Sequence, residues 1–110
     1  MVKARAKATH EQLREHNLHL LLRAVYIGEA DNRAALAHQT GLAKPTVSEL
    51  VGELMKTGLL EEGGHGQSTE SGGKRPRLLR FVPTARQVIG ISVDTFRVSG
   101  VLANLDGQAV

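Results

Sequence analysis

The sequence predicts a small α+β domain that is mainly helical and carries one β-hairpin. Two observations predict this fold class. Apolar residues recur at helical spacing over much of residues 9–57, and two short strand-like runs then flank a loop rich in Gly, Ser and cations. A chain of 110 residues can hold one compact domain with an adequate core. The sequence contains no cysteine, so disulfides and cysteine-based zinc sites are excluded within it.

The first predicted helix runs from residue 9 to about residue 28, and residues 28–31 form a loop. Its start, Thr9-His10-Glu11-Gln12, has the form of a capping box. Five apolar residues follow at helical spacing: Leu13, Leu18, Leu21, Leu22 and Val25. We interpret residues 18–22 and Tyr26 as part of the core or as a surface that pairs two protomers.

Residues 33–54 predict two short helices joined by a glycine turn. Asn32 is the candidate N-cap of the first helix, and Gly41 ends it. Pro45 fits the first turn of the second helix, residues 44–57, because its missing N–H removes no intrahelical bond there. One face of this helix is apolar at positions i, i+3, i+4 and i+7, occupied by Val47, Leu50, Val51 and Leu54.

This pair of helices is typical of a helix-turn-helix. Ala37, Gly41 and Val47 supply the small, turn and buried β-branched residues that the motif needs where its helices cross. The exposed start of the second helix is expected to enter the major groove of double-stranded DNA, with Lys44, Thr46 and Ser48 contacting it. The predicted contact residues of the motif are Arg33 and Gln39 near the backbone, and Lys44, Pro45, Thr46, Ser48 and Glu49 in the recognition helix.

The hairpin that follows predicts a wing. Residues 59–62 and 78–82 are the expected strands, and residues 63–77 the connecting loop. The loop tip combines two glycines and a proline with Lys74, Arg75 and Arg77. That composition suits contact with the phosphate backbone or insertion into a narrow minor groove. The alternative is a solvated loop without a partner.

The distribution of charge supports a polyanionic partner. The net charge is only +3, but an acid-free run from residue 71 to residue 93 contains three of the wing cations together with Arg80 and Arg86. Lys3, Arg5 and Lys7 form a second acid-free patch. The longest apolar run near the start, residues 20–22, is too short for a signal peptide or a membrane span. We therefore expect a cytoplasmic protein without a membrane contact.

The last part of the chain predicts a further group of strands. Residues 88–94 and 97–105 read as two strands, and the turn Asp106-Gly107 leads into a third at residues 108–110. Such a group has an apolar face with no partner, and a lone hairpin is marginal in water. We expect the chain to be truncated within a second domain.

Three segments in this order resemble the regulators of the ROK group (repressor, open reading frame, kinase). They are TGLAKPTVSELVGELMKTGLLEE, the wing segment GGKRPRLLRF, and VIGISVD with VLANLDGQAV. The resemblance runs from about residue 15 to residue 110. It implies an N-terminal winged helix-turn-helix (residues 15–83) after a basic arm (residues 1–14), and the first strands of an actin-like sugar-sensing domain (residues 84–110). It also implies a homodimer that represses, or sometimes activates, carbohydrate genes, with a sugar or sugar-phosphate effector bound by the absent part of that domain.

The chain departs from the family pattern at three positions. Ala43 stands where relatives usually have a capping Ser, and Ala35 where they have Glu, so both helix starts are expected to fray. Glu49 stands where relatives are often basic. An acidic side chain there has three alternatives: it accepts a bond from a cytosine amino group, pairs with a cation such as Lys56 or Arg33, or points away from DNA.

An enzyme is the first competing function class, because kinases of the same family share the actin-like fold. Their phosphate loop resembles Asp-x-Gly-Gly-Thr, whereas this chain has Asp94-Thr95-Phe96-Arg97 without the glycines. The chain also lacks a carboxylate pair or nucleophile–base pair that supports catalysis. We expect no enzymatic activity, no catalytic residues and no cofactor.

Metal binding and protein binding are the remaining alternatives. His16 and His19 lie one helical turn apart, but the segment adds only Glu15, so no metal site is expected. A winged helix that binds only other proteins is the third function class. The cationic start of the recognition helix and the basic wing favour DNA over that alternative.

Overall fold

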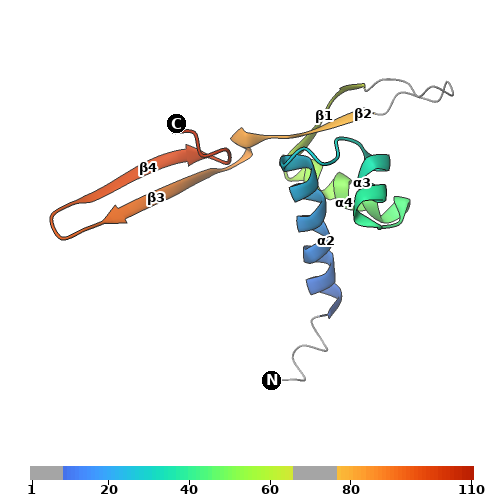
Figure 1. Cartoon of the computed structure of the whole chain (residues 1–110), viewed down its shortest axis with the longest axis horizontal. Helices are drawn as coiled ribbons and strands as arrows, with labels where there is room; N and C mark the ends of the chain where they lie inside the picture. The colour runs from blue at the N-terminus through green and yellow to red at the C-terminus, as the bar shows by residue number, and fades with distance from the viewer. Residues whose placement is uncertain (1–8, 66–76) are drawn as a thin grey trace.

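The computed structural model describes residues 9–65 and 77–110 (Figure 1). The elements in chain order are α2 (Thr9–Tyr26), α3 (Arg33–Thr40), α4 (Lys44–Lys56), β1 (Leu60–His65), β2 (Arg77–Phe81), the 3-10 helix η1 (Pro83–Ala85), β3 (Gln87–Val93) and β4 (Val98–Asn104). The strands form two separate antiparallel hairpins, β1–β2 and β3–β4. The predicted α+β fold of the winged helix-turn-helix type is confirmed.

One core holds α2, α3, α4 and the base of the β1–β2 hairpin together. Its largest fully buried side chains are Leu21, Leu36, Val47, Val51 and Leu60. The second strand of the hairpin adds Leu79, which is 2% exposed. Because residues from all five elements share this cluster, the wing and the two helices of the motif are fixed relative to one another by burial of apolar surface.

Leu13, near the start of α2, lies outside this core. That side chain is 55% exposed, although it follows the same helical spacing as the buried Leu21 and Val25. Figure 1 shows that the N-terminal turns of α2 extend beyond α3 and α4. Helical spacing assigns a residue to a face, but it does not say where the neighbouring helices end. The capping box at Thr9 borders residues 1–8, which lie outside the described residues, and it stays a prediction.

The turn between α3 and α4 follows the predicted chemistry. The Asn32 side chain accepts a hydrogen bond of 2.8 Å from the Ala35 N–H, which caps α3. Gly41 ends α3 with φ of 75°, in the left-handed region that glycine enters without a steric penalty. At Ala43 no side chain caps α4, and Pro45 occupies its first turn. The α3–α4 unit is therefore a helix-turn-helix with one capped and one uncapped helix start.

The wing strands differ in length from those predicted. The first, β1, continues to His65 instead of ending at residue 62, so the connection is shorter than residues 63–77. Its pairing slips by one residue between Glu62 and His65, which marks a β-bulge. Gly64 in this bulge has φ of 101°, a conformation that strand propensities do not predict. The base of the wing is also tied to the helices, because the Leu79 N–H donates a 2.7 Å bond to the Asp31 carbonyl.

The β3–β4 hairpin lies on the other side of α2 from α3 and α4 (Figure 1). All seven residues of β3 are exposed, and in β4 Ala103 is the one buried residue. After the predicted turn the chain returns beside β4, where Ala109 bridges to Ala103 and the Val110 N–H donates to the Leu102 carbonyl at 2.8 Å. The described residues thus contain an apolar hairpin without a covering layer. No helix within residues 9–65 and 77–110 has the length and hydropathy of a membrane span.

Candidate nucleic-acid interface

The exposed start of α4 is the centre of the candidate interface. Lys44, Pro45 and Ser48 are exposed, and Thr46 is partly buried. The opposite face of the same helix is buried through Val47, Leu50, Val51 and Leu54. Because that apolar face fixes the helix in the core, the polar residues of its first turns are presented on a rigid element.

Glu49 is held by a cation that the sequence did not predict. The Arg14 guanidinium of α2 lies 3.5 Å from the Glu49 carboxylate and also forms an ion pair with Glu53. The two named candidate partners were wrong: Arg33 pairs elsewhere, and the structure gives no ion pair between Glu49 and Lys56 among the described residues. Arg14 thus partly neutralises two carboxylates on α4. No sequence pattern indicated it, because the pair joins residues 35 positions apart.

Arg33 and Arg77, both predicted DNA contacts, converge on Glu62. Arg33 at the start of α3 approaches one carboxylate oxygen at 3.0 Å, and Arg77 at the start of β2 approaches the other at 3.2 Å. Arg33 additionally contacts the Met55 sulfur at 3.7 Å. Hydrogen bonds from Arg77 and then Arg33 hold the pKa of the Glu62 carboxyl below its ordinary value.

The lowered pKa of Glu62 predicts an acid-dependent contribution to stability. A carboxyl group whose folded pKa is depressed stabilises the fold above its unfolded pKa, and this stabilisation is lost as the pH falls through the folded value. The unfolding free energy of wild type is expected to exceed that of Glu62→Gln at pH 7, with a gap that closes as the pH falls below about 4.5. Urea titrations of both proteins between pH 3 and pH 7 measure the gap. A gap that is constant over this range would contradict the assignment.

The remaining predicted contact residues either bond to another part of the fold or lie outside the described residues. Gln39 is exposed on α3, and its amide donates a 3.2 Å bond to Glu29 in the preceding loop. Lys74 and Arg75 of the wing tip lie outside the described residues, as does the N-terminal basic patch. The structure therefore brings Arg33 and Arg77 together on Glu62, with Arg33 beside Met55 near the C-terminal end of α4 and not at its start, and it leaves the wing tip as a prediction.

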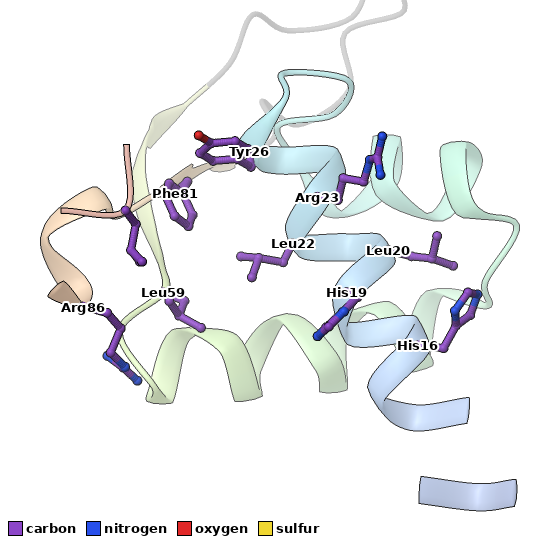
Figure 2. A pocket seen from close by; sticks show the side chains of 10 residues that line it. His16, His19, Leu20, Leu22, Arg23, Tyr26, Leu59, Phe81 and Arg86 are labelled. Atoms are coloured by element: carbon purple, nitrogen blue, oxygen red, sulfur yellow. The ribbon is translucent and has the colours of Figure 1, made fainter. Parts of the chain in front are cut away.

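A groove opens beside α2, away from the start of α4. It measures about 720 Å³. The side chains of Tyr26 and Phe81 meet edge to face at its upper end, with ring centroids 4.8 Å apart (Figure 2). The lining residues are His16, His19, Leu20, Leu22, Arg23, Tyr26, Leu59, Phe81, Arg86 and Leu105. Of the residues interpreted as core or dimer surface, Leu21 is core, whereas Leu20 and Tyr26 are exposed at this groove.

The metal and nucleotide alternatives concern His16 and His19 on α2 and the turn after Asp94. His16 and His19 are exposed, and no group of three or more potential metal ligands occurs there. Asp94 accepts 2.8 Å bonds from the backbone N–H groups of Phe96 and Arg97, which closes the β3–β4 turn. These donors are already occupied by a carboxylate and are not arranged as a phosphate-binding loop.

Comparisons with known proteins agree with this geometry. A model of the IclR helix-turn-helix domain matches residues 26–64, which include α3 and α4. The xylose repressors of Bacillus spizizenii and Bacillus subtilis are 44% and 42% identical to the chain over 94 residues, which are 86% of this chain and 24% of each relative. The xylose repressor of Caldicellulosiruptor bescii is 32% identical over 101 residues, or 92% of this chain and 25% of that protein. The chain thus spans about a quarter of the length of these relatives.

Proposed function

We propose that this chain, which is similar to about a quarter of the length of several xylose repressors, is the DNA-binding part of a transcriptional repressor of carbohydrate genes. The single observation that carries the proposal is the helix-turn-helix itself. Its second helix is fixed by a fully apolar buried face and presents a polar, cationic first turn to solvent. That arrangement suits a helix that enters the major groove with its N-terminal residues at the base edges.

The proposed roles follow from exposure and chemistry. Lys44, Thr46 and Ser48 contact the major groove, where a hydroxyl reads a base edge and an ammonium favours guanine or phosphate. Pro45 shapes this turn. Arg33 and Gln39 act near the backbone, and the wing cations Lys74, Arg75 and Arg77 follow the phosphates or enter the minor groove. Glu49 is restrained by Arg14, which reduces its repulsion from phosphates.

The wider assignments complete the proposal. We place the chain in the ROK group, with residues 15–83 as the winged helix-turn-helix and residues 84–110 as the start of a sugar-sensing domain. The exposed apolar faces of β3 and β4 support this division, since they need a covering layer. The regulator acts as a homodimer in the cytoplasm, and its effector is a sugar or sugar phosphate. Its function is regulation without catalysis.

A salt titration tests the proposal. A dimer that neutralises about six to eight phosphates should lose affinity for duplex DNA with a slope of log affinity on log salt of about −5 to −7. Fluorescence anisotropy with a labelled duplex between 50 and 300 mM KCl, about the range in which this effect is large, measures the slope. Absence of binding at the lowest salt, or a flat response, would contradict DNA binding and favour a protein-interaction module.

A further inference from the structure

Glu62 lies between two cations that come from different parts of the fold. Arg33 reaches its Oε1 from the start of α3, and Arg77 reaches its Oε2 from the wing strand β2. The Glu62 side chain is 27% exposed, whereas Arg33 and Arg77 are 34% and 66% exposed. One carboxylate therefore holds two guanidinium groups at the junction of wing and helix-turn-helix.

The β1–β2 register explains how Glu62 reaches this junction. Side chains alternate between the two faces of a strand, so Glu62 lies on the same face as the buried Leu60. Glu62 is opposite Leu79, whose N–H bonds to the Asp31 carbonyl two residues before Arg33. The neighbouring Glu61 is on the other face and pairs with Arg80 at 3.3 Å. The strand register and the backbone hydrogen bond from Leu79 to Asp31 therefore help to fix where Glu62 and Arg33 meet, in addition to the reach of their side chains.

We propose that Glu62 is a positioning residue that restricts Arg33 and Arg77 to the phosphates of a correctly docked duplex. The inference rests on the proposed DNA-binding function and deepens it. Contacts to phosphates carry no sequence information, so an unrestrained arginine strengthens binding to every duplex alike. A carboxylate that occupies both guanidinium groups competes with any phosphate. A phosphate that the docked helix-turn-helix holds beside these groups displaces the carboxylate more readily than a randomly placed one, so the competition raises the preference for the cognate site.

The central experiment compares Glu62→Gln with Glu61→Gln. Both variants remove one negative charge from β1, but Glu61→Gln frees a single cation on the opposite face. Because each new phosphate contact adds about 0.9 to the salt slope, Glu62→Gln should bind random duplex about 3–10-fold more tightly, with a slope steeper by about 1–2. Its preference for the selected duplex over the random one should fall at least threefold. Glu61→Gln should change affinity less than about twofold.

A second variant tests the same restraint from the arginine side. If Glu62 holds Arg33 away from random phosphates, Arg33→Gln should weaken binding to the selected duplex at least threefold more than it weakens binding to the random duplex. In the Glu62→Gln background, Arg33→Gln should remove part of the gained random affinity. Circular dichroism shows whether Glu62→Gln folds. If it does not fold, Arg33→Gln alone tests whether Glu62 restrains Arg33.

The outcomes separate this inference from the function on which it rests. If wild type binds no duplex at low salt, the proposed function is wrong. If wild type binds DNA but Glu62→Gln and Glu61→Gln shift random affinity equally, or Glu62→Gln weakens it, the role of Glu62 is overturned and the function stands. Losses on Arg33→Gln that differ less than about threefold between the selected and the random duplex would equally overturn it.

Discussion

Replacing Leu36 by Ala is expected to lower the free energy of unfolding by about 3–5 kcal/mol, the range for a leucine removed from a core that collapses only partly. Leu36 is fully buried and is the one buried residue of α3. The other residues of that eight-residue helix that pack against the core, Ala35 and Ala37, are small and only partly buried, so they cannot fill the cavity. Urea denaturation followed by circular dichroism measures the loss, and the variant should also lose DNA affinity because α3 supports α4.

The matched control is Leu13→Ala on α2. This leucine is 55% exposed, so its removal should cost less than about 1 kcal/mol. Similar losses for the two variants would contradict the described core. They would indicate that α2 packs along its whole length.

Thr46→Ala and Ser48→Ala are expected to have the second large effect, on sequence discrimination. Each lost base-edge contact should cost about 1–3 kcal/mol, or roughly 5- to 150-fold in affinity, on the preferred duplex. Binding to random duplex should change little, because phosphate contacts dominate it. Competition anisotropy with the two duplexes measures both affinities.

Ser99→Ala is the control for these variants, since Ser99 is an exposed serine on β4, in the separate hairpin. It should leave both affinities unchanged. Equal losses on preferred and random duplex for Thr46→Ala or Ser48→Ala would assign these hydroxyls to the phosphate backbone. The recognition helix would then position the domain without reading bases.

The helix-turn-helix could be predicted from the sequence because its determinants are local. The Asn32 cap, the Gly41 turn and the apolar spacing of α4 each act within a few residues, and the structure contains all three. The general positions of the hairpin strands were predictable for the same reason. Their ends were not, because the bulge at Gly64 depends on cross-strand pairing rather than on strand composition.

The ion pairs of the candidate site could not be predicted, because they join distant parts of the chain. Arg14 meets Glu49 and Glu53 only once α2 has packed beside α4, and Glu62 meets Arg33 only through the wing register. One signal for Glu62 was present: it alternates with Leu60 as an acidic residue on the inward face of a strand. An inward acidic residue in such a place requires a cationic partner.

Selection of bound sequences from a pool of random duplexes tests whether the start of α4 reads base edges. The 110-residue chain should enrich a common sequence over successive rounds, and the Thr46→Ala, Ser48→Ala double variant should fail to enrich it while retaining binding to the unselected pool. Two copies of the sequence, with centres about one helical turn or a multiple of it apart, would also support the homodimer. If wild type binds the pool but enriches no sequence, or if the double variant enriches the same sequence equally, α4 does not read base edges. Sequence-specific recognition through Thr46 and Ser48 would then be wrong.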